Sequence, residues 1–350
     1  MDIPVTPSAL QPRAANPEFA AIVRFLAEPR NYPDATGRVD TIETHMSWVF
    51  LTDRHAWKLK KPVRQSYLDF STEAARRHYC AEEVRLNRRL TDGVYLEAVP
   101  LTVDADGKLR LGPHGSVVDW LVKMRRLPAE RMLDRMIRAG SVQADDVRRI
   151  VGTLCRFYRG CAPVAMGEGE YRERFAAGIA ANLLELGAME FALPSATFES
   201  TCARQRAFLE HAAALFDERV RGGHIVEGHG DLRPEHICLE QPPQIIDCLE
   251  FSLDFRLLDT ADELAFLALE CERLGAAWMR QAIFATCADL SGDAPPDGLL
   301  HFHQSFRACV RAKIALWHLQ EPSLTDPSKW TTQAREYLRL ADSHIAQCGY

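Results

Sequence analysis

Residues 229–237 read HGDLRPEHI, and residues 245–251 read IIDCLEF. Asp231 follows a glycine and precedes Leu-Arg-Pro, so it is expected on a tight loop. Asp247 comes directly after the apolar pair that opens the second stretch, which places it at the end of a strand. Phosphoryl transfer needs two such acids, because one orients or accepts the proton of the attacking hydroxyl and the other holds Mg²⁺ against the nucleotide phosphates. It also needs a cation for those phosphates, which must come from elsewhere in the chain.

A lysine-bearing strand offers that cation. In the stretch AWKLKK (56–61), strand alternation places Ala56, Lys58 and Lys60 on one face. An alanine two residues before a lysine matches the V-A-I-K pattern, so we expect Lys58 to reach the phosphates. Lys60, together with Lys61, is expected to form a solvated basic edge.

A helix predicted at residues 71–90 carries the acid that would orient Lys58. It opens at a Ser-Thr pair followed by a glutamate, a common start for a helix. Glu82 and Glu83 both have spacings to later leucines that suit an inward-leaning face. The sequence therefore leaves the choice between them open.

The composition is that of an ordinary globular protein. The chain has 350 residues, of which 47% are apolar and 26% charged, enough for a two-lobed enzyme with a sizeable core. A formal net charge of −6 argues against a general nucleic-acid binder. No apolar run approaches the ~18–20 residues of a membrane helix, and the N-terminus lacks the order of a signal peptide. The ten cysteines form no C-x-x-C pair, so reduced thiols in a cytoplasmic protein are expected.

Strand signals come first along the chain, and helix signals follow. Strands are predicted within residues 41–63 and 116–128, with a hairpin at 98–111 around the turn Asp-Ala-Asp-Gly. Helical periodicity then dominates, and the predicted helices cover residues 141–161, 171–188, 197–220 and the chain from about 259 onward. The pattern is α+β with two lobes: a small antiparallel sheet with one main helix, then a larger helical lobe that carries the two acidic stretches.

Three parts of the chain follow from this pattern. Residues 1–32 are an N-terminal extension with a short helix, residues 33–125 the sheet lobe, and residues 126–350 the helical lobe. Residues 1–15 are rich in proline and alanine and are expected to be loose, and Asn16 is the predicted cap of the short helix. A ligand pocket is commonly found between two lobes.

The stretches HGDLRPEHI, IIDCLEF and LLDTADELAFL (257–267) resemble the catalytic and metal loops of the aminoglycoside phosphotransferase family. That family has a protein-kinase-like fold and includes choline and fructosamine kinases. The resemblance covers roughly residues 35–128 and 225–270, and it is nearest to a bacterial branch with ETH, WVFLT and KLKKPV near its start. It implies an ATP- and Mg²⁺-dependent transfer of the γ-phosphate to a hydroxyl or amine of a small molecule, but it does not supply the acceptor.

Carried over position by position, the resemblance implies a nucleotide site. Lys58 would pair with the α- and β-phosphates, and Glu83 or Glu82 would hold it. The turn Thr44–Ser47 would replace a glycine-rich loop, with Ser47 and backbone N–H groups covering the phosphates. The hinge to the adenine would lie near Val122–Lys123–Met124.

The resemblance also implies roles for the acidic stretches. Asp231 would be the catalytic acid, and Arg233 would keep a positive charge near the γ-phosphate. Asp247 would be the Mg²⁺ ligand. Asp259 and Asp262 resemble the aspartates that brace the catalytic loop.

His236 departs from the family pattern, which has an asparagine five residues after the catalytic aspartate. An asparagine offers a hard oxygen to Mg²⁺, whereas a neutral imidazole prefers ions such as Zn²⁺ or Mn²⁺. Either Glu250 supplies the missing oxygen, or His236 binds a Mn²⁺-like ion, or the second metal site is lost.

Alternatives to the phosphotransferase stay open. A pseudokinase, favoured by His236, would bind nucleotide without phosphate transfer, and a relative could transfer the AMP part of ATP instead. His229, Asp231 and His236 could also form a two-His-one-carboxylate metal site, although this leaves the lysine strand unexplained. Under the phosphotransferase hypothesis, His229 is expected to hold the catalytic loop in place.

The acceptor is expected in the helical lobe, around residues 163–220 and beyond 270. Four acids there could attract a cationic acceptor or form an ordinary solvated face: Glu168, Glu170, Glu173 and Glu185. The expected partner is thus a small molecule, with no nucleic acid and no membrane. The oligomeric state does not follow from the sequence.

Overall fold

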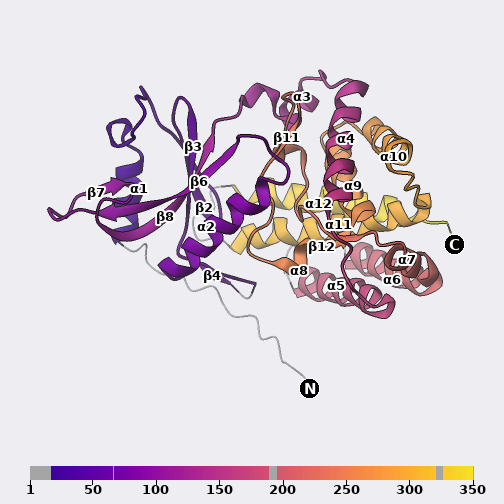
Figure 1. The fold of residues 1–350 in the computed structure, drawn as a ribbon. Helices are drawn as coiled ribbons and strands as arrows, with labels where there is room; N and C mark the ends of the chain where they lie inside the picture. The colour runs from indigo at the N-terminus through magenta and orange to yellow at the C-terminus, as the bar shows by residue number, and fades with distance from the viewer. Residues whose placement is uncertain (1–16, 66, 189–194, 321–325, 350) are drawn as a thin grey trace.

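The computed structural model describes residues 17–65, 67–188, 195–320 and 326–349. Within them the chain forms a sheet lobe with its two helices and then a helical lobe (Figure 1). The expectations for residues 1–15 and for Asn16 lie outside the described residues, and the predicted part boundaries stay predictions. None of the described helices is both long and apolar enough to cross a membrane.

The sheet lobe is built on a six-stranded antiparallel sheet with the order β1-β2-β3-β8-β6-β7. Its strands are β1 (Asp40–Glu43), β2 (Ser47–Leu51), β3 (His55–Lys60), β6 (Tyr95–Val103), β7 (Leu109–Leu111) and β8 (Ser116–Arg125). A short hairpin, β4 (Arg64–Gln65) with β5 (Leu68–Asp69), follows β3. The predicted strands in residues 41–63 and the predicted hairpin at 98–111 are confirmed.

The two faces of the sheet are covered by different helices. Trp57 and Leu59 of β3 pack with α1 (Pro17–Leu26), so this helix belongs to the core of the sheet lobe. On the opposite face, α2 (Glu73–Asn87) lies against β6 and β8 (Figure 1). Thr72 caps α2 by accepting the N–H of Ala75, as its sequence predicted. Because side chains alternate along a strand, the lysines of β3 point toward α2.

The helical lobe contains most of the helices. They are α3 (Leu133–Arg138), α4 (Ala144–Gly160), α5 (Glu168–Ala188), α6 (Ser195–His211), α7 (Ala213–Arg221), α8 (Leu253–Arg256), α9 (Thr260–Arg273), α10 (Trp278–Ser291), α11 (Asp297–Trp317) and α12 (Pro327–Ile345). The single helix predicted at 197–220 is wrong, because the chain breaks at Ala212 (φ −97°, ψ 20°) between α6 and α7. Phe208 and Phe216, on either side of the break, pack into one apolar cluster.

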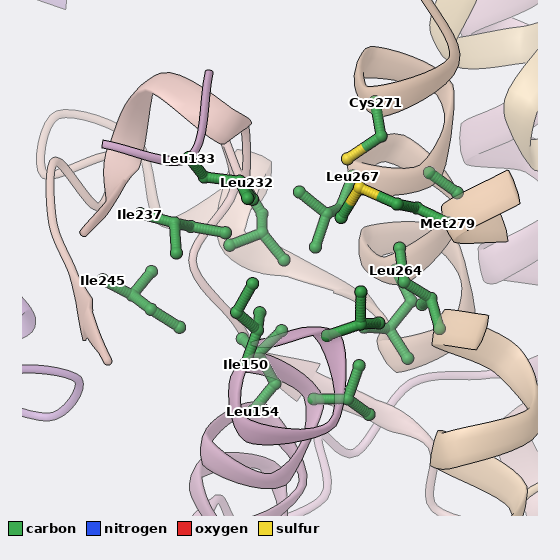
Figure 2. Close-up of a cluster of buried hydrophobic side chains, with 14 of the residues drawn as sticks. Leu133, Ile150, Leu154, Leu232, Ile237, Ile245, Leu264, Leu267, Cys271 and Met279 are labelled. Carbon is green, nitrogen blue, oxygen red and sulfur yellow. The ribbon is translucent and has the colours of Figure 1, made fainter. Parts of the chain in front are cut away.

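Two loops reach the lobe junction from the apolar core of the helical lobe. We call residues 228–236 the HGD loop and residues 246–252 the IDC loop. Between them, β10 (Ile237–Cys238) pairs with β11 (Gln244–Ile245), while β9 (Ile225–Glu227) before them pairs with β12 (Leu257–Asp259) after them. Figure 2 shows how side chains of this segment enter the core formed by α4 and α9; they are Leu232, Ile237 and Ile245, packed with Ile150, Leu154 and Leu264. The loops are thus anchored by burial on a rigid base.

Candidate active site

Lys58 lies where the two lobes meet. Its ammonium group donates to Oε1 of Glu83 on α2 at 2.9 Å and to Oδ1 of Asp247 in the IDC loop at 2.6 Å. It points to this side because Trp57 and Leu59 fill the other face of the sheet. Burial opposes its charge, but Asp247 and Glu83 raise the pKa of Lys58 well above the usual value. The lysine therefore remains a cation at the junction.

Glu83, rather than Glu82, is the partner of Lys58. Glu83 is fully buried, whereas Glu82 points outward and pairs with Arg85, one turn along the helix, at 2.8 Å. Burial alone would raise the pKa of Glu83, but Lys58 and Lys60 hold it below its usual value. The spacing of α2 allowed either glutamate, and packing against the sheet decides between them.

The expectation that Lys60 is a solvated edge is wrong. Its side chain is 0% exposed, and its ammonium group donates to Oε2 of Glu83 at 2.5 Å and to Oε1 of Glu250. Lys60 lies on the same face as Lys58, and two carboxylates compensate its charge there. Lys61 points the other way and pairs with the half-exposed Glu43.

The HGD loop is fastened to the IDC loop by a histidine. His229 is fully buried, donates from Nε2 to the carbonyl of Ile246 at 2.8 Å, and accepts the N–H of Asp231 on Nδ1 at 3.2 Å. Gly230 adopts φ +88°, and a Cβ there would lie 3.2 Å from the carbonyl oxygen of Phe255. His229 thus holds the loop, as expected from the sequence.

Glu263 braces the same loop from α9. Its carboxylate accepts the backbone N–H of His229 at 2.9 Å and of Gly230 at 2.7 Å, and the hydroxyl of Tyr158 at 2.8 Å. The N–H groups of His229 and Gly230 belong to no helix or strand, and the buried carboxylate of Glu263 supplies the hydrogen-bond acceptor for both. The backbone immediately before Asp231 is therefore fixed by charge-assisted hydrogen bonds.

Asp259 and Asp262, which we expected to brace the loop, have other partners. Asp259 caps α9 and binds Arg219 through both oxygens at 2.8 Å. Asp262 binds Arg307, with Oδ1 at 2.8 Å and Oδ2 at 2.5 Å. The expectation is wrong because the helical register turns the next position, Glu263, toward the HGD loop.

Asp231 lies in a positively charged environment. Its Oδ2 accepts from Nε of Arg233 at 3.0 Å, and the side chain is 23% exposed. Burial acts to raise the pKa of Asp231, but Arg233 foremost, with Arg311 of α11, lowers it to about 2. Arg311 is itself 3.3 Å from both the carboxylate of Glu270 and the hydroxyl of Tyr337. Asp231 is therefore ionised at neutral pH.

His236 faces both acidic loops. Its Nδ1 donates to the carbonyl of Asp231 at 2.8 Å, since a carbonyl can only accept, and its Nε2 accepts from Arg233 at 3.0 Å. Burial, with Arg233 next, lowers the pKa of His236 to about 4, so the ring is neutral at pH 7. Nε2 also lies 3.5 Å from Oδ2 of Asp247. The ring thus presents an unprotonated nitrogen beside a carboxylate.

Asp247 has a left-handed backbone, with φ +64°. Aspartate is one of the few residues that tolerate this conformation, which here turns the carboxylate toward Lys58 and His236. The N–H of Asp247 donates to the hydroxyl of Tyr95 at 3.1 Å. Burial would raise its pKa, but Lys58 foremost holds it well below the usual range. Glu250, the other predicted oxygen ligand, binds Lys60 instead of facing His236.

The other residues predicted for the nucleotide site lie along the sheet. Thr44 closes the turn before β2, where its Oγ1 accepts the N–H of Ser47 at 3.0 Å, and Ser47 is buried beside Lys60 in the β2–β3 ladder. Val122 and Met124, predicted near the hinge, lie within β8, where Val122 pairs with Lys58. The chain leaves the sheet only after β8 and crosses to the helical lobe at 126–128.

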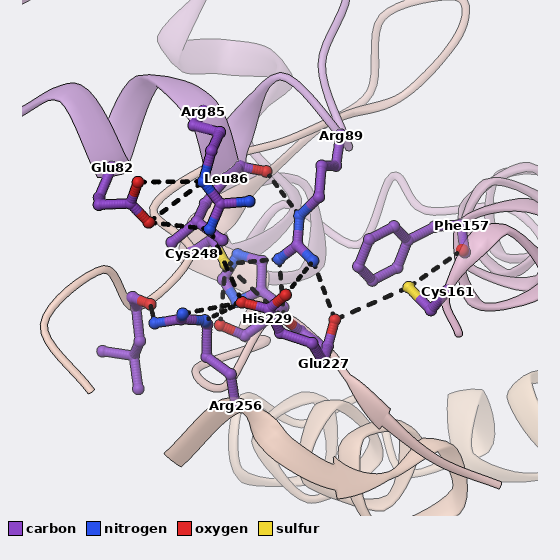
Figure 3. Close-up of polar contacts among 12 residues, drawn as sticks. Glu82, Arg85, Leu86, Arg89, Phe157, Cys161, Glu227, His229, Cys248 and Arg256 are labelled. Carbon is purple, nitrogen blue, oxygen red and sulfur yellow. Dashed lines mark hydrogen bonds and ion pairs between the residues drawn. The ribbon is translucent and has the colours of Figure 1, made fainter. Parts of the chain in front are cut away.

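Two arginines hold the segments that lead into the two loops, Arg89 just after α2 and Arg256 at the end of α8. Arg89, just after α2, donates to the carbonyl of Glu227 at 3.0 Å (Figure 3). It also donates to the carbonyl of Gly228 at 3.1 Å. Arg256 donates to the carboxylate of Glu227 at 2.8 Å (Figure 3). It also donates to the carbonyl of Leu249 in the IDC loop at 2.7 Å. No sequence motif marks these two arginines, because most of their contacts are made to backbone carbonyls.

Two of the four acids proposed for a cationic acceptor already have cationic partners. Glu185 accepts from Lys313 at 3.3 Å and from the indole of Trp317 at 2.9 Å, and Glu168 pairs with Arg221 at 3.1 Å. These contacts leave less free negative charge on this face than the sequence implied.

Asp247 and His236 are the two groups at the junction whose chemistry suits a divalent cation. The carboxylate of Asp247 is a hard oxygen ligand, and Nε2 of His236 is an unprotonated nitrogen with its tautomer set by the carbonyl of Asp231. Among the described residues no cluster of three or more His, Cys, Asp or Glu side chains has metal-site geometry. Further ligands would come from nucleotide phosphates and water, as is usual for Mg²⁺.

Comparison with known proteins gives sequence relatives of this chain and solved structures that resemble it. No protein-family model matches the chain. Uncharacterised proteins of Mycobacterium tuberculosis and Mycobacterium bovis are 31% identical to it in an alignment 321 residues long that covers 89% of this chain. The chain spans 62% of the length of these relatives.

Two solved structures share its fold. A choline/ethanolamine kinase family protein from Mesorhizobium loti matches with a TM-score of 0.53 and 15% identity, over 95% of this chain and 98% of that chain. A thermostable mutant of aminoglycoside phosphotransferase APH(4)-Ia matches with a TM-score of 0.54 and 11% identity, over 93% and 98%. The chain has a protein-kinase-like fold. The resemblance inferred from the sequence is thereby confirmed at the level of the fold.

Proposed function

We propose that this protein is an ATP-dependent phosphotransferase that moves the γ-phosphate to a hydroxyl or amine of a small molecule. The observation that carries the proposal is Lys58, held between Glu83 of the sheet lobe and Asp247 of the IDC loop. A lysine, its orienting glutamate and a metal-binding aspartate form the phosphate site of kinase-like enzymes. The shared fold with a choline/ethanolamine kinase family protein and an aminoglycoside phosphotransferase supports the same class.

Asp231 would orient the acceptor. With a pKa of about 2 it is a weak base, so its carboxylate accepts a hydrogen bond from the acceptor and takes the proton only late in the transfer. Such timing suits a loose transition state, in which the acceptor oxygen needs little activation. Arg233, bonded to Asp231, would add positive charge beside the transferred phosphoryl group.

Lys58 would exchange one partner for the nucleotide. Its ammonium group has three donors, of which Glu83 and Asp247 take two in this structure. The phosphates would take the place of Asp247, which then becomes free to hold the cation with His236. Bound Mg²⁺ or Mn²⁺ would neutralise charge on the phosphates.

A pseudokinase remains the second candidate, and His236 favours it. Its Nε2 already accepts from Arg233, so metal binding would have to displace that hydrogen bond. A phosphotransferase would consume ATP and a pseudokinase would only bind it. An AMP-transferring enzyme would move the α-phosphate with its nucleoside instead of the γ-phosphate.

Labelled ATP tests these candidates. The protein would be incubated with ATP labelled in either the γ- or the α-phosphate, with Mg²⁺ or Mn²⁺ and a panel of small alcohols and amines. We expect transfer of the γ-label alone, and its loss in Asp231→Asn. Transfer of the α-label would indicate AMP transfer, and nucleotide binding without any transfer across the panel would favour the pseudokinase.

A further inference from the structure

Lys60 is a second lysine on the Lys58 face of β3, fully buried, that the reaction outlined above does not use. It is 0% exposed, and its ammonium group lies between Oε2 of Glu83, at 2.5 Å, and Oε1 of Glu250. The ring of Phe70 covers it, with the ammonium nitrogen 5.0 Å from the ring centroid. Burying an ammonium group costs free energy unless carboxylates pair with it, and here Glu83 and Glu250 both do so.

The two partners of Lys60 come from different lobes. Glu83 belongs to α2, and Glu250 belongs to the IDC loop, three residues after Asp247. Arg256 donates to the carbonyl next to Glu250, that of Leu249, at 2.7 Å, so the backbone of this segment is also held. Lys60 thus fastens the sheet lobe to the segment that carries Asp247.

The carboxylate of Glu83 is divided between the two lysines. Oε1 binds Lys58 and Oε2 binds Lys60. If Lys58 turns to the nucleotide phosphates, Glu83 keeps a cation on its other oxygen and stays in place. Glu250, whose carboxylate is taken by Lys60, is at the same time kept out of the coordination sphere of a metal at Asp247.

We infer that Lys60 and Glu250 form an interlobe clasp that positions Glu83 and Asp247 for nucleotide with its metal. Both are positioning residues: they act through their neighbours and touch neither nucleotide nor acceptor. The inference rests on the proposed function, because it assumes that Asp247 holds a cation beside bound ATP. It also assigns Glu250 to the clasp rather than to the metal.

A paired substitution separates positioning from simple stability. Lys60→Met alone leaves the carboxylates of Glu83 and Glu250 without the cation between them and should destabilise the fold strongly. Lys60→Met/Glu250→Met instead replaces the pair with apolar side chains of similar length. Affinity for ATP would be measured by calorimetry, with Mg²⁺ and with EDTA, together with the melting temperature. We expect the double variant to melt close to the wild type yet bind ATP with Mg²⁺ about 10- to 100-fold more weakly, as for the loss of groups that orient metal ligands. In EDTA its affinity should match that of the wild type.

A second interlobe pair provides the matched control. Arg125 of β8 binds Glu240 of the helical lobe through two contacts of 2.9 and 2.6 Å. Arg125→Met/Glu240→Met should keep the Mg²⁺-dependent gain in ATP affinity, and an equal loss there would overturn the clasp in favour of general loosening of the lobes. A Lys60→Met/Glu250→Met variant with wild-type affinity in Mg²⁺ would overturn the clasp alone. A wild-type protein without any metal-dependent affinity for ATP would overturn the proposed function as well.

Discussion

Glu263 should be the residue on which the shape of the HGD loop depends most. Its carboxylate accepts three hydrogen bonds, from the N–H groups of His229 and Gly230 and from the hydroxyl of Tyr158. Glu263→Ala removes the acceptor and leaves all three donors buried without a partner. Each orphaned donor costs about 1–3 kcal/mol, so the three together should lower the free energy of unfolding by about 3–9 kcal/mol.

A matched variant separates the part of this free-energy loss that comes from the two backbone N–H groups of the HGD loop. Tyr158→Phe removes one donor but leaves the carboxylate on the two backbone N–H groups, and should cost about 1 kcal/mol. Urea unfolding of both variants at pH 7 gives the two free energies. ATP affinity should fall in Glu263→Ala and be kept in Tyr158→Phe. If Glu263→Ala cost no more than Tyr158→Phe, the bracing role of the carboxylate would be refuted.

The remaining predictions concern the charged groups of the site. Lys58→Met should cost about 1 kcal/mol in urea unfolding, because the carboxylate of Asp247 that it leaves behind is 41% exposed. Lys60→Met should cost about 3–5 kcal/mol, because it removes the cation from the nearly buried carboxylate of Glu250 and leaves Glu83 with Lys58 alone. Equal costs would contradict this. His236→Asn should shift the preference of ATP binding from Mn²⁺ toward Mg²⁺, measured as the ratio of the two Kd values, and an unchanged ratio would exclude His236 as a ligand. Burial and Arg233 lower the pKa of His236 from 6.5 to about 4. Between these two pH values the unfolded chain binds a proton on this ring and the folded chain does not. The free energy of unfolding therefore falls as the pH drops. The loss between pH 7 and pH 5 should be about 2 kcal/mol for this group, and His236→Asn should remove that share; an identical pH dependence in the variant would refute the assignment.

The sheet lobe could be predicted from sequence because its signals are local. The alternation in β3, the cap at Thr72 and the Asp-Ala-Asp-Gly turn each depend on neighbours in the chain. The break between α6 and α7 could not, because Ala212 stands in a stretch without glycine or proline and only tertiary packing separates the helices there.

The candidate site shows the same limit. The two acidic stretches and Lys58 carry their own motifs, and the structure brings Lys58, Asp247 and His236 together. Lys60 and Glu263 carry no motif: an exposed and a buried lysine look alike in sequence, and one step in helical register separates Asp262 from Glu263. Burial and register come from the whole fold, so they had to be read from the structure.

The central claim is that Asp247 holds a cation on ATP beside Lys58. The most direct test is calorimetric titration of ATP into the wild type and into Asp247→Asn, each with Mg²⁺, with Mn²⁺ and with EDTA. Asparagine tolerates the left-handed backbone of this position, so the variant removes the charge and keeps the loop. We predict that the wild type binds ATP more tightly with a divalent cation and that this difference disappears in the variant. A wild type indifferent to metal, or a variant that keeps the full metal-dependent gain, would contradict the claim.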